Sequence, residues 1–208
     1  MPSTDWTVPQ LSPVTLSGLL VRLQPLEAGH VEQLAAVGLE PELWTLQPEI
    51  VSSIADMRAY VQEALDEQQR GVSLPFTIVE EHSGLIIGST RFMDIAVAHR
   101  RLEIGATWLT PAAQRTGANI EAKLLLLTEA FERLQIQKVV IKTETLNEQS
   151  QRAIRALGAV EEGIFRQQFI SETGRARDMI YFAIFAESWT ETKARLQERL
   201  ERYRSVGR

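Results

Sequence analysis

The sequence predicts a single α/β domain in which helices flank one mixed sheet. Three observations predict this fold class. The chain has 208 residues, about the length of one domain, and 44% of them are hydrophobic, which is enough to bury a core. Segments with the apolar alternation of strands and segments with the apolar period of helices follow one another. No internal repeat or shift in composition divides the chain, so one sheet is the simplest packing.

The N-terminal third is expected to form an arm, one strand and two helices. Residues 1–17 are rich in Pro, Ser and Thr and are expected to form a loose arm that can end in a short strand. The elements expected after it are a strand at Leu19–Leu23, a helix at Ala28–Val37 capped by Gly38, a loop at Leu39–Ile50 that carries Trp44, and a helix from Ser52 or Ser53 to Gly71.

The middle of the chain is expected to form three strands. Phe76–Glu80 and Leu85–Asp94 are joined by EHSG, a sequence typical of a hairpin turn. Arg101–Leu109 alternates, which predicts a strand with its even-numbered residues from Leu102 to Trp108 on one side. Gly105 in the interior of this strand indicates a bulge or a close backbone approach.

The C-terminal part is expected to alternate helices and strands and to end in a charged tail helix. The tail's Arg and Glu residues alternate, which predicts a solvated or dimer-contacting surface and leaves a homodimer open. The expected boundaries are an arm at residues 1–17, one domain at 18–188 and a helical tail at 189–208. The elements are a helix at Asn119–Gln135, a strand at Lys138–Thr143, a helix at Asn147–Gly158, strands at Val160–Ile170 and Arg177–Phe185, and a tail helix at Glu191–Arg204.

Composition excludes several kinds of protein. The formal net charge is −5, which argues against a nucleic-acid binder because such proteins usually display a basic surface. The chain has no cysteine and only three scattered histidines, so we expect no disulfide, no thiol nucleophile and no metal site. No apolar run reaches the length of a membrane span and no signal-peptide pattern opens the chain, so the expected location is the cytoplasm.

The loop Gln114–Asn119 combines small and polar residues at the start of a predicted helix. The first N–H groups of a helix have no intrahelical acceptor, and the helix dipole favours an anion near them. Gly117 and Ala118 would let a ligand approach the backbone, and Arg115 adds a positive charge. The loop therefore fits a pyrophosphate, although it matches neither GxxxxGK[ST] nor GxGxxG, and an ordinary strand-to-helix turn would look similar.

Several segments between Glu103 and Trp189 resemble the GNAT superfamily of N-acetyltransferases, and within it the RimJ/RimL-type branch. They occur in the order and spacing of that family and cover roughly the C-terminal half of the chain. The N-terminal half agrees in element order only. The segments are EIGATWL (Glu103–Leu109), QRTGAN (Gln114–Asn119), EAKLLLLTEAFERL (Glu121–Leu134), NEQSQRAIRALGA (Asn147–Ala159), EEGIFR (Glu161–Arg166), GRARD (Gly174–Asp178) and ESW (Glu187–Trp189).

The resemblance implies a mostly antiparallel sheet that binds acetyl-CoA as co-substrate, without a metal. Asn119 stands where Gly or Ala is commoner in the family, but it can still cap the helix. The strand Glu103–Leu109 should separate from Lys138–Thr143 to admit pantetheine, and a backbone N–H near Thr107–Leu109 should polarise the thioester carbonyl. The residues that the resemblance assigns to acetyl-CoA are Trp108, Leu109, Gln114, Arg115, Thr116, Gly117, Ala118, Asn119, Asn147 and Ser150.

Asn147 and Ser150 are candidates for contact with the leaving thiol. Many relatives place a Tyr there as the proton donor, but Ile154 occupies that position in this chain. RimL-type members carry a Ser that Ser150 matches, so Ser150 is the candidate proton donor and Asn147 a candidate to bind pantetheine. Asn147 also fits a purely structural role, as a helix N-cap that accepts from the N–H of Ser150.

Glu103 is the candidate general base, acting through a water, because this family often keeps a base on the central strand. The alternative is a carboxylate that pairs with an Arg on the face of the strand. An α-amine with a pKa of about 7.8 is about a tenth neutral at pH 7, whereas a lysine amine needs roughly 4–5 kcal/mol to lose its proton. Gln168 and Phe169 stand where relatives show His and Glu, and neither can act as a base.

These observations predict an acetyl-CoA-dependent N-acetyltransferase whose acceptor amine attacks the thioester directly, without an acyl-enzyme. The expected acceptor is the N-terminal α-amine of a protein or peptide, or a small-molecule amine. The alternative is a catalytically weak or inactive acyl-CoA-binding sensor or interaction module. Arg177 and Asp178 are expected to form an ion pair or to line the acceptor groove, and Trp44 to cover that groove or to pack in the core.

Overall fold

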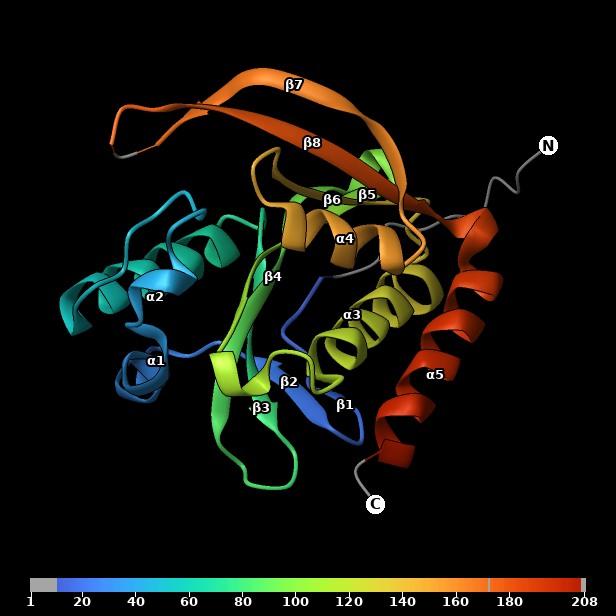
Figure 1. Cartoon of the computed structure of the whole chain (residues 1–208), viewed down its shortest axis with the longest axis horizontal. Helices are drawn as coiled ribbons and strands as arrows, with labels where there is room; N and C mark the ends of the chain where they lie inside the picture. The colour runs from blue at the N-terminus through green and yellow to red at the C-terminus, as the bar shows by residue number, and fades with distance from the viewer. Residues whose placement is uncertain (1–10, 172, 207–208) are drawn as a thin grey trace.

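The computed structural model describes residues 11–171 and 173–206, so residues 1–10 of the expected arm, Glu172 of the SETGR turn and the last two residues of the tail lie outside the described part. One sheet runs through the molecule between two groups of helices (Figure 1). The strands are β1 (Leu16–Ser17), β2 (Val21–Pro25), β3 (Leu74–Glu80), β4 (Ile86–Ala96), β5 (Arg101–Leu109), β6 (Lys138–Glu144), β7 (Val160–Ile170) and β8 (Ala176–Phe185). The helices are α1 (Val31–Gly38), α2 (Ile54–Gln69), α3 (Ala118–Thr128), α4 (Glu148–Ala156) and α5 (Trp189–Val206).

The strand order is β1-β2-β3-β4-β5-β6-β8-β7, and among the strands of the described residues only the β5–β6 pair is parallel. This arrangement confirms the predicted fold class, a mixed and mostly antiparallel sheet with flanking helices and a C-terminal helix. The order of elements along the chain also agrees with the prediction, including a short strand at the end of the arm. No helix among the described residues is long and apolar enough to cross a bilayer.

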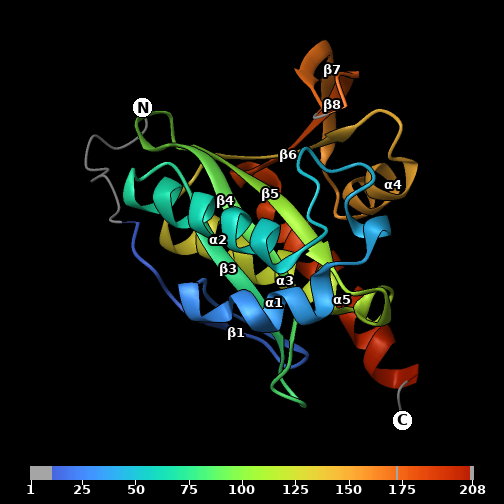
Figure 2. The ribbon, with the colours of Figure 1, turned by 90° about the vertical axis from the view of Figure 1, so that its left-hand side faces the viewer.

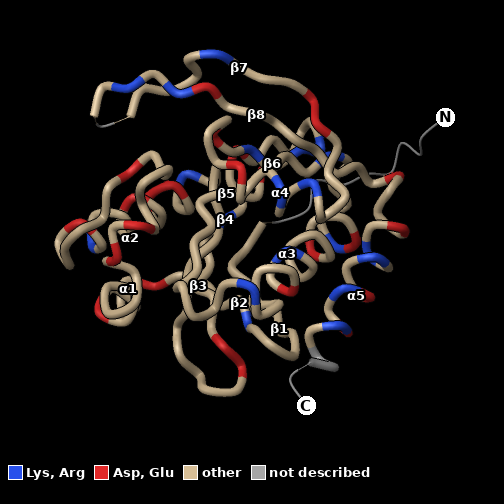
Figure 3. The backbone as a smooth tube through the Cα atoms, in the orientation of Figure 1, with Lys and Arg blue, Asp and Glu red and all other residues tan. Residues whose placement is uncertain are grey.

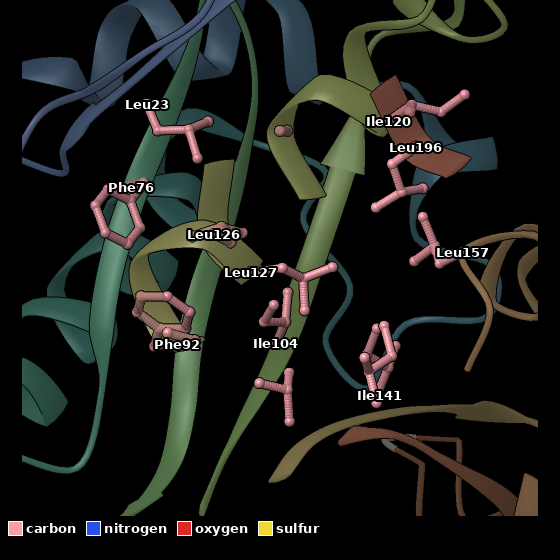
Figure 4. Packing of buried hydrophobic residues seen from close by; sticks show 14 of the residues in the cluster. Leu23, Phe76, Phe92, Ile104, Ile120, Leu126, Leu127, Ile141, Leu157 and Leu196 are labelled. Atoms are coloured by element: carbon pink, nitrogen blue, oxygen red, sulfur yellow. The ribbon is translucent and has the colours of Figure 1, made fainter. Parts of the chain in front are cut away.

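Each face of the sheet has its own hydrophobic core. The face covered by α3, α4 and α5 holds the larger core, to which Phe92, Ile104 and Leu126 contribute (Figure 4). The other face holds a smaller core under α1 and α2, centred on Trp44 and Trp108. Figure 2 shows α1 and α2 in front of the strands and α3 and α5 behind them. Because the two cores are separate, the face to which a β5 side chain points decides its neighbours.

A bulge in β5 changes which face its side chains reach. Gly105 pairs with Arg91 and Trp108 pairs with Ser89, so two residues of β5 lie opposite the single residue Thr90. Ala106, the first of the two, has a left-handed φ of 46°. The prediction that Trp108 shares a face with Leu102 and Ile104 was therefore wrong. The extra residue reverses the alternation and sends the Trp108 indole into the smaller core.

Three local predictions need correction. β2 starts at Val21, the first residue of this segment that pairs with β3, rather than at Leu19. Gly38 is the last residue of α1 and not a left-handed cap. A side chain at this position would collide with the Trp108 ring, because a Cβ would lie 2.6 Å from it. The long helix after the loop ends at Thr128 as an α-helix and continues as a π-helical turn at Glu129–Arg133.

The tail helix α5 packs on the main core. Leu196 and Leu200 are buried there, against the side of the molecule that carries α3. The exposed face of α5 carries charges such as the Glu198–Arg202 pair. The apolar side of the helix is thus used within the chain, which favours the solvated interpretation of its outer face.

Candidate active site

A cleft is expected where β5 and β6 stop pairing. The two parallel strands pair at only three positions, from Arg101 opposite Lys138 to Glu103 opposite Val140. Beyond Glu103, β5 continues to Leu109 and β6 to Glu144 without pairing to each other. The predicted separation of these strands is therefore confirmed. It leaves one edge of β5, including the bulge, free of a β partner.

The loop from residue 114 to 119 joins the end of β5 to α3 and presents backbone N–H groups. Gly117 is the N-cap of α3 with a φ of 93°, a left-handed conformation that favours glycine. The first hydrogen bond of the helix runs from Glu121 N to Gly117 O, so the N–H groups of residues 118–120 have no intrahelical acceptor. Thr116 Oγ1 lies 3.4 Å from the N–H of Ala118. The N–H groups of residues 119 and 120 remain available for an anion.

Asn119 does not cap the helix as expected, because the helix begins one residue earlier at Ala118. Its side chain lies in the first turn, and its Oδ1 is buried without a hydrogen-bond partner. A buried polar atom without a partner is costly, which indicates that a ligand or water completes this site. An amide oxygen accepts hydrogen bonds, so the partner of Oδ1 must be a donor and not a phosphate oxygen. A pyrophosphate-containing ligand such as CoA is matched instead by the left-handed Gly117 and the free N–H groups of the first turn.

The remaining residues of the loop are exposed to solvent. Arg115 has a left-handed φ of 64° and places a positive charge in the loop that leads to the N-terminus of α3. Gln114 Nε2 donates to the carbonyl of Leu109 at 3.2 Å, which ties the loop to the end of β5. Of the two β5 residues predicted to bind cofactor, Leu109 faces the main core and Trp108 the smaller one, so both can offer only backbone groups to the cleft.

Asn147 caps α4, as predicted. Its Oδ1 accepts from the N–H of Ser150 at 3.0 Å, which positions Ser150 in the first turn of the helix. Ser150 is half-buried, and α4 begins just after the C-terminal end of β6. The N-termini of α3 and α4 thus lie beyond the separating ends of β5 and β6, where both helix dipoles favour negative charge.

Glu103 lies at the last paired position of β5 and is almost fully buried. Its carboxylate forms an ion pair with Lys142 at 2.8 Å. The alternative prediction, that Glu103 pairs with a cation on the face of the strand, is therefore confirmed except that the cation is a Lys and not an Arg. Burial raises the pKa of Glu103 and Lys142 opposes the rise. Lys142 also lies over the rings of Phe169 and Tyr181, at 5.3 and 5.7 Å from their centroids.

Arg177 of β8 joins the β7–β8 hairpin to β6 by a buried ion pair and to the loop between α1 and α2 by a hydrogen bond. Arg177 is fully buried, donates to Glu144 at 2.9 Å and donates to the carbonyl of Leu46 at 2.7 Å. Arg175 binds the same carboxylate. The predicted Arg177–Asp178 pair was therefore wrong, because neighbouring residues of a strand point to opposite faces. Asp178 instead accepts from the N–H of Gln167.

A pocket of about 230 Å³ lies between this loop and the tip of the hairpin. Trp44 and Ile50 line one side, and Ser171 and Arg175 line the other. Trp44 also packs in the smaller core, with its Nε1 donating to the carbonyl of Gly38, which confirms its predicted packing role. Its cover of an acceptor groove stays a prediction.

Gln47 links the pocket to the cleft. It lines the pocket, and its Nε2 lies 3.5 Å from the carbonyl oxygen of Thr107 in the β5 bulge. The pocket therefore opens beside the free edge of β5. Within the described residues no cluster of three or more His, Cys, Asp or Glu side chains could hold a metal ion.

Lys123 of α3 is a further residue near the cleft that was not among the predicted site residues. Its side chain is buried and its Nζ donates to Thr107 Oγ1 at 2.6 Å, beside the bulge. Burial lowers the pKa of Lys123 to about 7. A signal was present, because a lone cation precedes four consecutive leucines in EAKLLLL and falls on the apolar face of the helix.

Comparison with known proteins agrees with this geometry. The family model described as the acetyltransferase (GNAT) domain matches residues 21–160. YdaF of Bacillus subtilis (strain 168), provisionally named a ribosomal N-acetyltransferase, is 27% identical over 112 residues. That alignment covers 54% of this chain and 60% of the length of YdaF.

Solved structures share the fold over nearly the whole chain. A GCN5-related N-acetyltransferase from Brucella melitensis is 28% identical with a TM-score of 0.87, covering 95% of this chain and 90% of that one. RimJ of Mycobacterium smegmatis, solved with CoA-disulfide, is 21% identical with a TM-score of 0.79, covering 90% and 95%, and supports the fold alone. The family model spans more than half of the chain, from β2 to the start of β7, and the chain belongs to the GNAT acetyltransferase family.

Proposed function

We propose that this protein transfers the acetyl group of acetyl-CoA to a primary amine by direct attack in a ternary complex. The favoured acceptor is the N-terminal α-amine of a protein or peptide, and a small-molecule amine is the other candidate. The observation that carries the proposal is the β5–β6 pairing, which ends at Glu103 and leaves a free strand edge that leads to the N-terminus of α3. A thioester with a pyrophosphate tail matches both features.

The surroundings of the pocket support a cationic acceptor. Residues 28–69, which include α1, α2 and the loop that lines the pocket, contain eight carboxylates and one arginine. Figure 3 shows mostly acidic residues on this side of the molecule. Such a surface attracts a protonated amine and raises its rate of encounter. The name of YdaF as a ribosomal N-acetyltransferase favours a protein N-terminus over a small molecule.

The pKa of the acceptor also favours an α-amine. At pH 7 an α-amine needs roughly 1 kcal/mol to become neutral and a lysine amine roughly 4–5 kcal/mol, from their ordinary pKa values. Glu103 is the proposed base, and a water between it and the acceptor would carry the proton. Because burial raises its pKa, this carboxylate binds a proton more readily than an exposed glutamate does.

Other groups of the chain bind and orient the co-substrate. Acetyl-CoA supplies the activated acetyl group and the leaving thiol. The N–H groups at the start of α3, with Gly117 and Asn119, are proposed to hold its pyrophosphate. The backbone near the β5 bulge is proposed to polarise the thioester carbonyl. Asn147 is proposed to contact pantetheine, and the Ser150 hydroxyl to donate a hydrogen bond to the leaving sulfur.

A non-catalytic acyl-CoA sensor is the second candidate. The ion pair between Glu103 and Lys142 favours it, since a carboxylate held by a lysine is a poorer base. Ile154, at the position of the Tyr acid of many relatives, is buried and cannot donate a proton. The sensor and the enzyme differ in one observable, which is whether bound acetyl-CoA turns over in the presence of an amine.

The variant Ser150→Ala should lower kcat by about 10- to 100-fold, because it loses the hydrogen bond to the leaving sulfur, which contributes about 1.5–3 kcal/mol when the acceptor is charged. Its affinity for acetyl-CoA should stay within about twofold, because the backbone N–H that binds Asn147 remains. Steady-state kinetics and calorimetric titration with CoA measure the two quantities. Ser83→Ala, in the exposed β3–β4 turn, is the matched control. An unchanged kcat in Ser150→Ala would exclude a role for this hydroxyl in turnover.

The variant Glu103→Gln should lower kcat/KM by about 10²-fold and remove the acid limb of its pH profile. In the wild type the raised pKa places this limb above the ordinary range of a glutamate, with activity falling as pH falls through it. The assay uses an acceptor amine whose pKa lies below the measured pH range, so that ionisation of the acceptor does not contribute to the pH profile. Glu161→Gln, at an exposed ion pair, is the control. If the acid limb persists in Glu103→Gln, another group is the base.

The proposal as a whole is tested by thiol release from acetyl-CoA across a panel of amines. The panel holds peptides with free N-termini, the same peptides with blocked N-termini and one free lysine, and small-molecule amines. We expect thiol release only with the peptides whose N-termini are free. Mass spectrometry should then place the acetyl group on their α-amine. Binding of acetyl-CoA without release for any amine would favour the sensor. No binding would overturn both candidates.

A further inference from the structure

Lys123 is a buried amine to which the proposed function gives no role. It precedes Leu126 and Leu127 by three and four residues, so it shares their face of α3, which packs against the sheet. Only 5% of the residue is exposed. Its Nζ donates to Thr107 Oγ1 at 2.6 Å, and this oxygen lies 2.8 Å from the hydroxyl of Thr90. The amine is therefore held under the β5 bulge by two hydroxyl groups in series.

No carboxylate among the described residues lies within ion-pair distance of Lys123. The charged groups on the elements around it are engaged elsewhere. They are Glu121 of α3, which accepts from the N–H groups of residues 19–21, Glu103 of β5 with Lys142, Arg91 of β4 with Glu67, Arg22 of β2 with Glu81, and Arg199 of α5 with the carbonyl of Ala156.

This burial makes the Lys123 amine ready to exchange a proton at neutral pH. An ammonium without a carboxylate loses its hydration on burial, so the pKa of Lys123 falls to about 7. A methionine at this position would fill the same space without a buried charge, and replacing buried charges by apolar groups is often neutral or stabilising. A lysine here is therefore not explained by stability.

The bulge decides where this amine acts. Glu103 and Lys142 lie on the face of the sheet opposite α3, because their neighbours Leu102 and Ile141 point into the main core. Thr107 points to the α3 face, since its hydroxyl contacts Lys123. It is half-buried on the edge of β5 that no strand covers. The proposed base and the Lys123–Thr107 pair therefore lie on opposite sides of the strand edge proposed to hold the thioester.

We propose that Lys123 supplies, through the Thr107 hydroxyl, the proton that the leaving thiol carries away. The inference rests on the proposed function and assigns its proton source. The Ser150 hydroxyl can donate a hydrogen bond to the sulfur, but a serine hydroxyl does not release a net proton near neutral pH. Lys123 is in these terms a positioning residue, because it acts through Thr107 and does not itself contact the sulfur.

The step balances in atoms and charge. The thioester C–S bond breaks, and its electron pair stays on sulfur while the acceptor nitrogen gains the acetyl group. Thr107 Oγ1 gives its proton to sulfur and takes one from Lys123 Nζ, which becomes neutral. The acceptor nitrogen releases one proton through the base to solvent, and Lys123 later takes one back. A cysteine thiol has a pKa of about 8.5, and a simple alkyl thiol is a weaker acid, so transfer from an amine with a pKa of about 7 runs downhill.

The first experiment measures the protonation of Lys123 directly. The chain has four lysines, so side-chain NMR of protein labelled at lysine Cε gives four signals, and Lys123→Met identifies one of them by its loss. In the free protein this signal should titrate with a midpoint near 7. Saturating CoA should shift the midpoint, and a CoA analogue that lacks the sulfur should shift it less. A midpoint above 9, or equal shifts with the two ligands, would overturn the inference.

The second experiment follows the pH profile of kcat/KM. An acid with a pKa near 7 makes activity fall as pH rises above 7, so the wild type should show this alkaline limb. Lys123→Met and Thr107→Val should lose the limb and at least tenfold of kcat, whereas Thr107→Ser should restore both. Lys123→Met should keep or raise Tm, which separates the role from a structural one. Lys193→Met, at a surface ion pair, is the control.

The outcomes separate this inference from the proposed function. Acetyl transfer with an alkaline limb that persists in Lys123→Met would overturn the role of Lys123 and leave the acetyltransferase intact. A CoA-dependent shift of the Lys123 signal in a protein that acetylates no amine would support the contact near the sulfur. It would also contradict the proposed function.

Discussion

Replacing Glu144 with alanine is expected to lower the free energy of unfolding by about 3–5 kcal/mol. The carboxylate is 1% exposed and binds Arg175 and the fully buried Arg177, so its removal leaves an arginine in the interior without a counter-charge. Because Arg177 also holds the carbonyl of Leu46, the loop that lines the pocket should loosen. Urea denaturation measures the stability, and the KM of the acceptor reports the loop.

Two further variants make this prediction specific. Glu161→Ala removes an exposed pair with Arg155 and should change stability by less than about 1 kcal/mol. The double variant with Met at positions 144 and 177 removes both buried charges and should recover most of the stability. It should still raise the KM of the acceptor, because the bond to Leu46 is gone. A KM of the acceptor equal to that of the wild type in the double variant would show that the loop keeps its position without the hydrogen bond from Arg177 to Leu46.

The Glu144 interaction also predicts a pH dependence of stability. The hydrogen bond from Arg175, followed by Arg177, lowers the pKa of Glu144 below its usual value of about 4.5 against the opposing effect of burial. The stabilisation is therefore fully present above the unfolded pKa of about 4.5. It is lost as pH falls through the lowered pKa of the folded state. Between pH 5 and 3 the wild type should lose more stability than Glu144→Ala.

Gly117→Val is expected to weaken acetyl-CoA binding by about 10- to 100-fold, or roughly 1.4–2.8 kcal/mol. Residue 117 has a φ of 93°, which a β-branched side chain strongly disfavours. A Cβ there would also lie 3.0 Å from Leu20 Cδ1 and 3.2 Å from the Tyr203 ring. The loop must shift to relieve both problems, and the N–H groups at the start of α3 would lose their alignment. Isothermal titration with CoA measures the effect.

The control for this variant is Gly84→Val. Gly84 also has a left-handed φ, of 70°, but it lies in the β3–β4 turn and a Cβ there would meet nothing within 4 Å. Its replacement should lower Tm through backbone strain and leave the CoA affinity unchanged. If Gly117→Val binds CoA as tightly as Gly84→Val does, the loop is not the pyrophosphate site.

Local sequence signals were sufficient for most elements. Ser53 caps α2 by accepting from Asp56, Asn147 caps α4, and the glycines at 71 and 158 close those helices with left-handed backbones. Each signal acts within one helical turn, so the sequence carries it without tertiary context. The prediction that Asn119 caps α3 failed because the preceding Gly117 already turns the chain.

Side-chain partners that are distant along the chain could not be predicted in this way. Glu144 meets Arg177 across 33 residues, and Glu121 meets the backbone of residues 19–21 across about a hundred. Nothing in the local pattern around Arg177 distinguishes Asp178 from Glu144 as its partner. Only the pairing of β6 with β8 places Glu144 and Arg177 on the same face.

The sequence by itself determined the class of fold, the order of elements and the loop before α3, because these depend on apolar periodicity and on turn residues close together in the chain. The tertiary structure alone decided where the charged groups of the site lie. One extra residue at Ala106–Thr107 reverses the alternation of β5, sends Trp108 to one core and leaves Thr107 on the face of Lys123. A bulge depends on the partner strand, so its position is a property of the folded sheet.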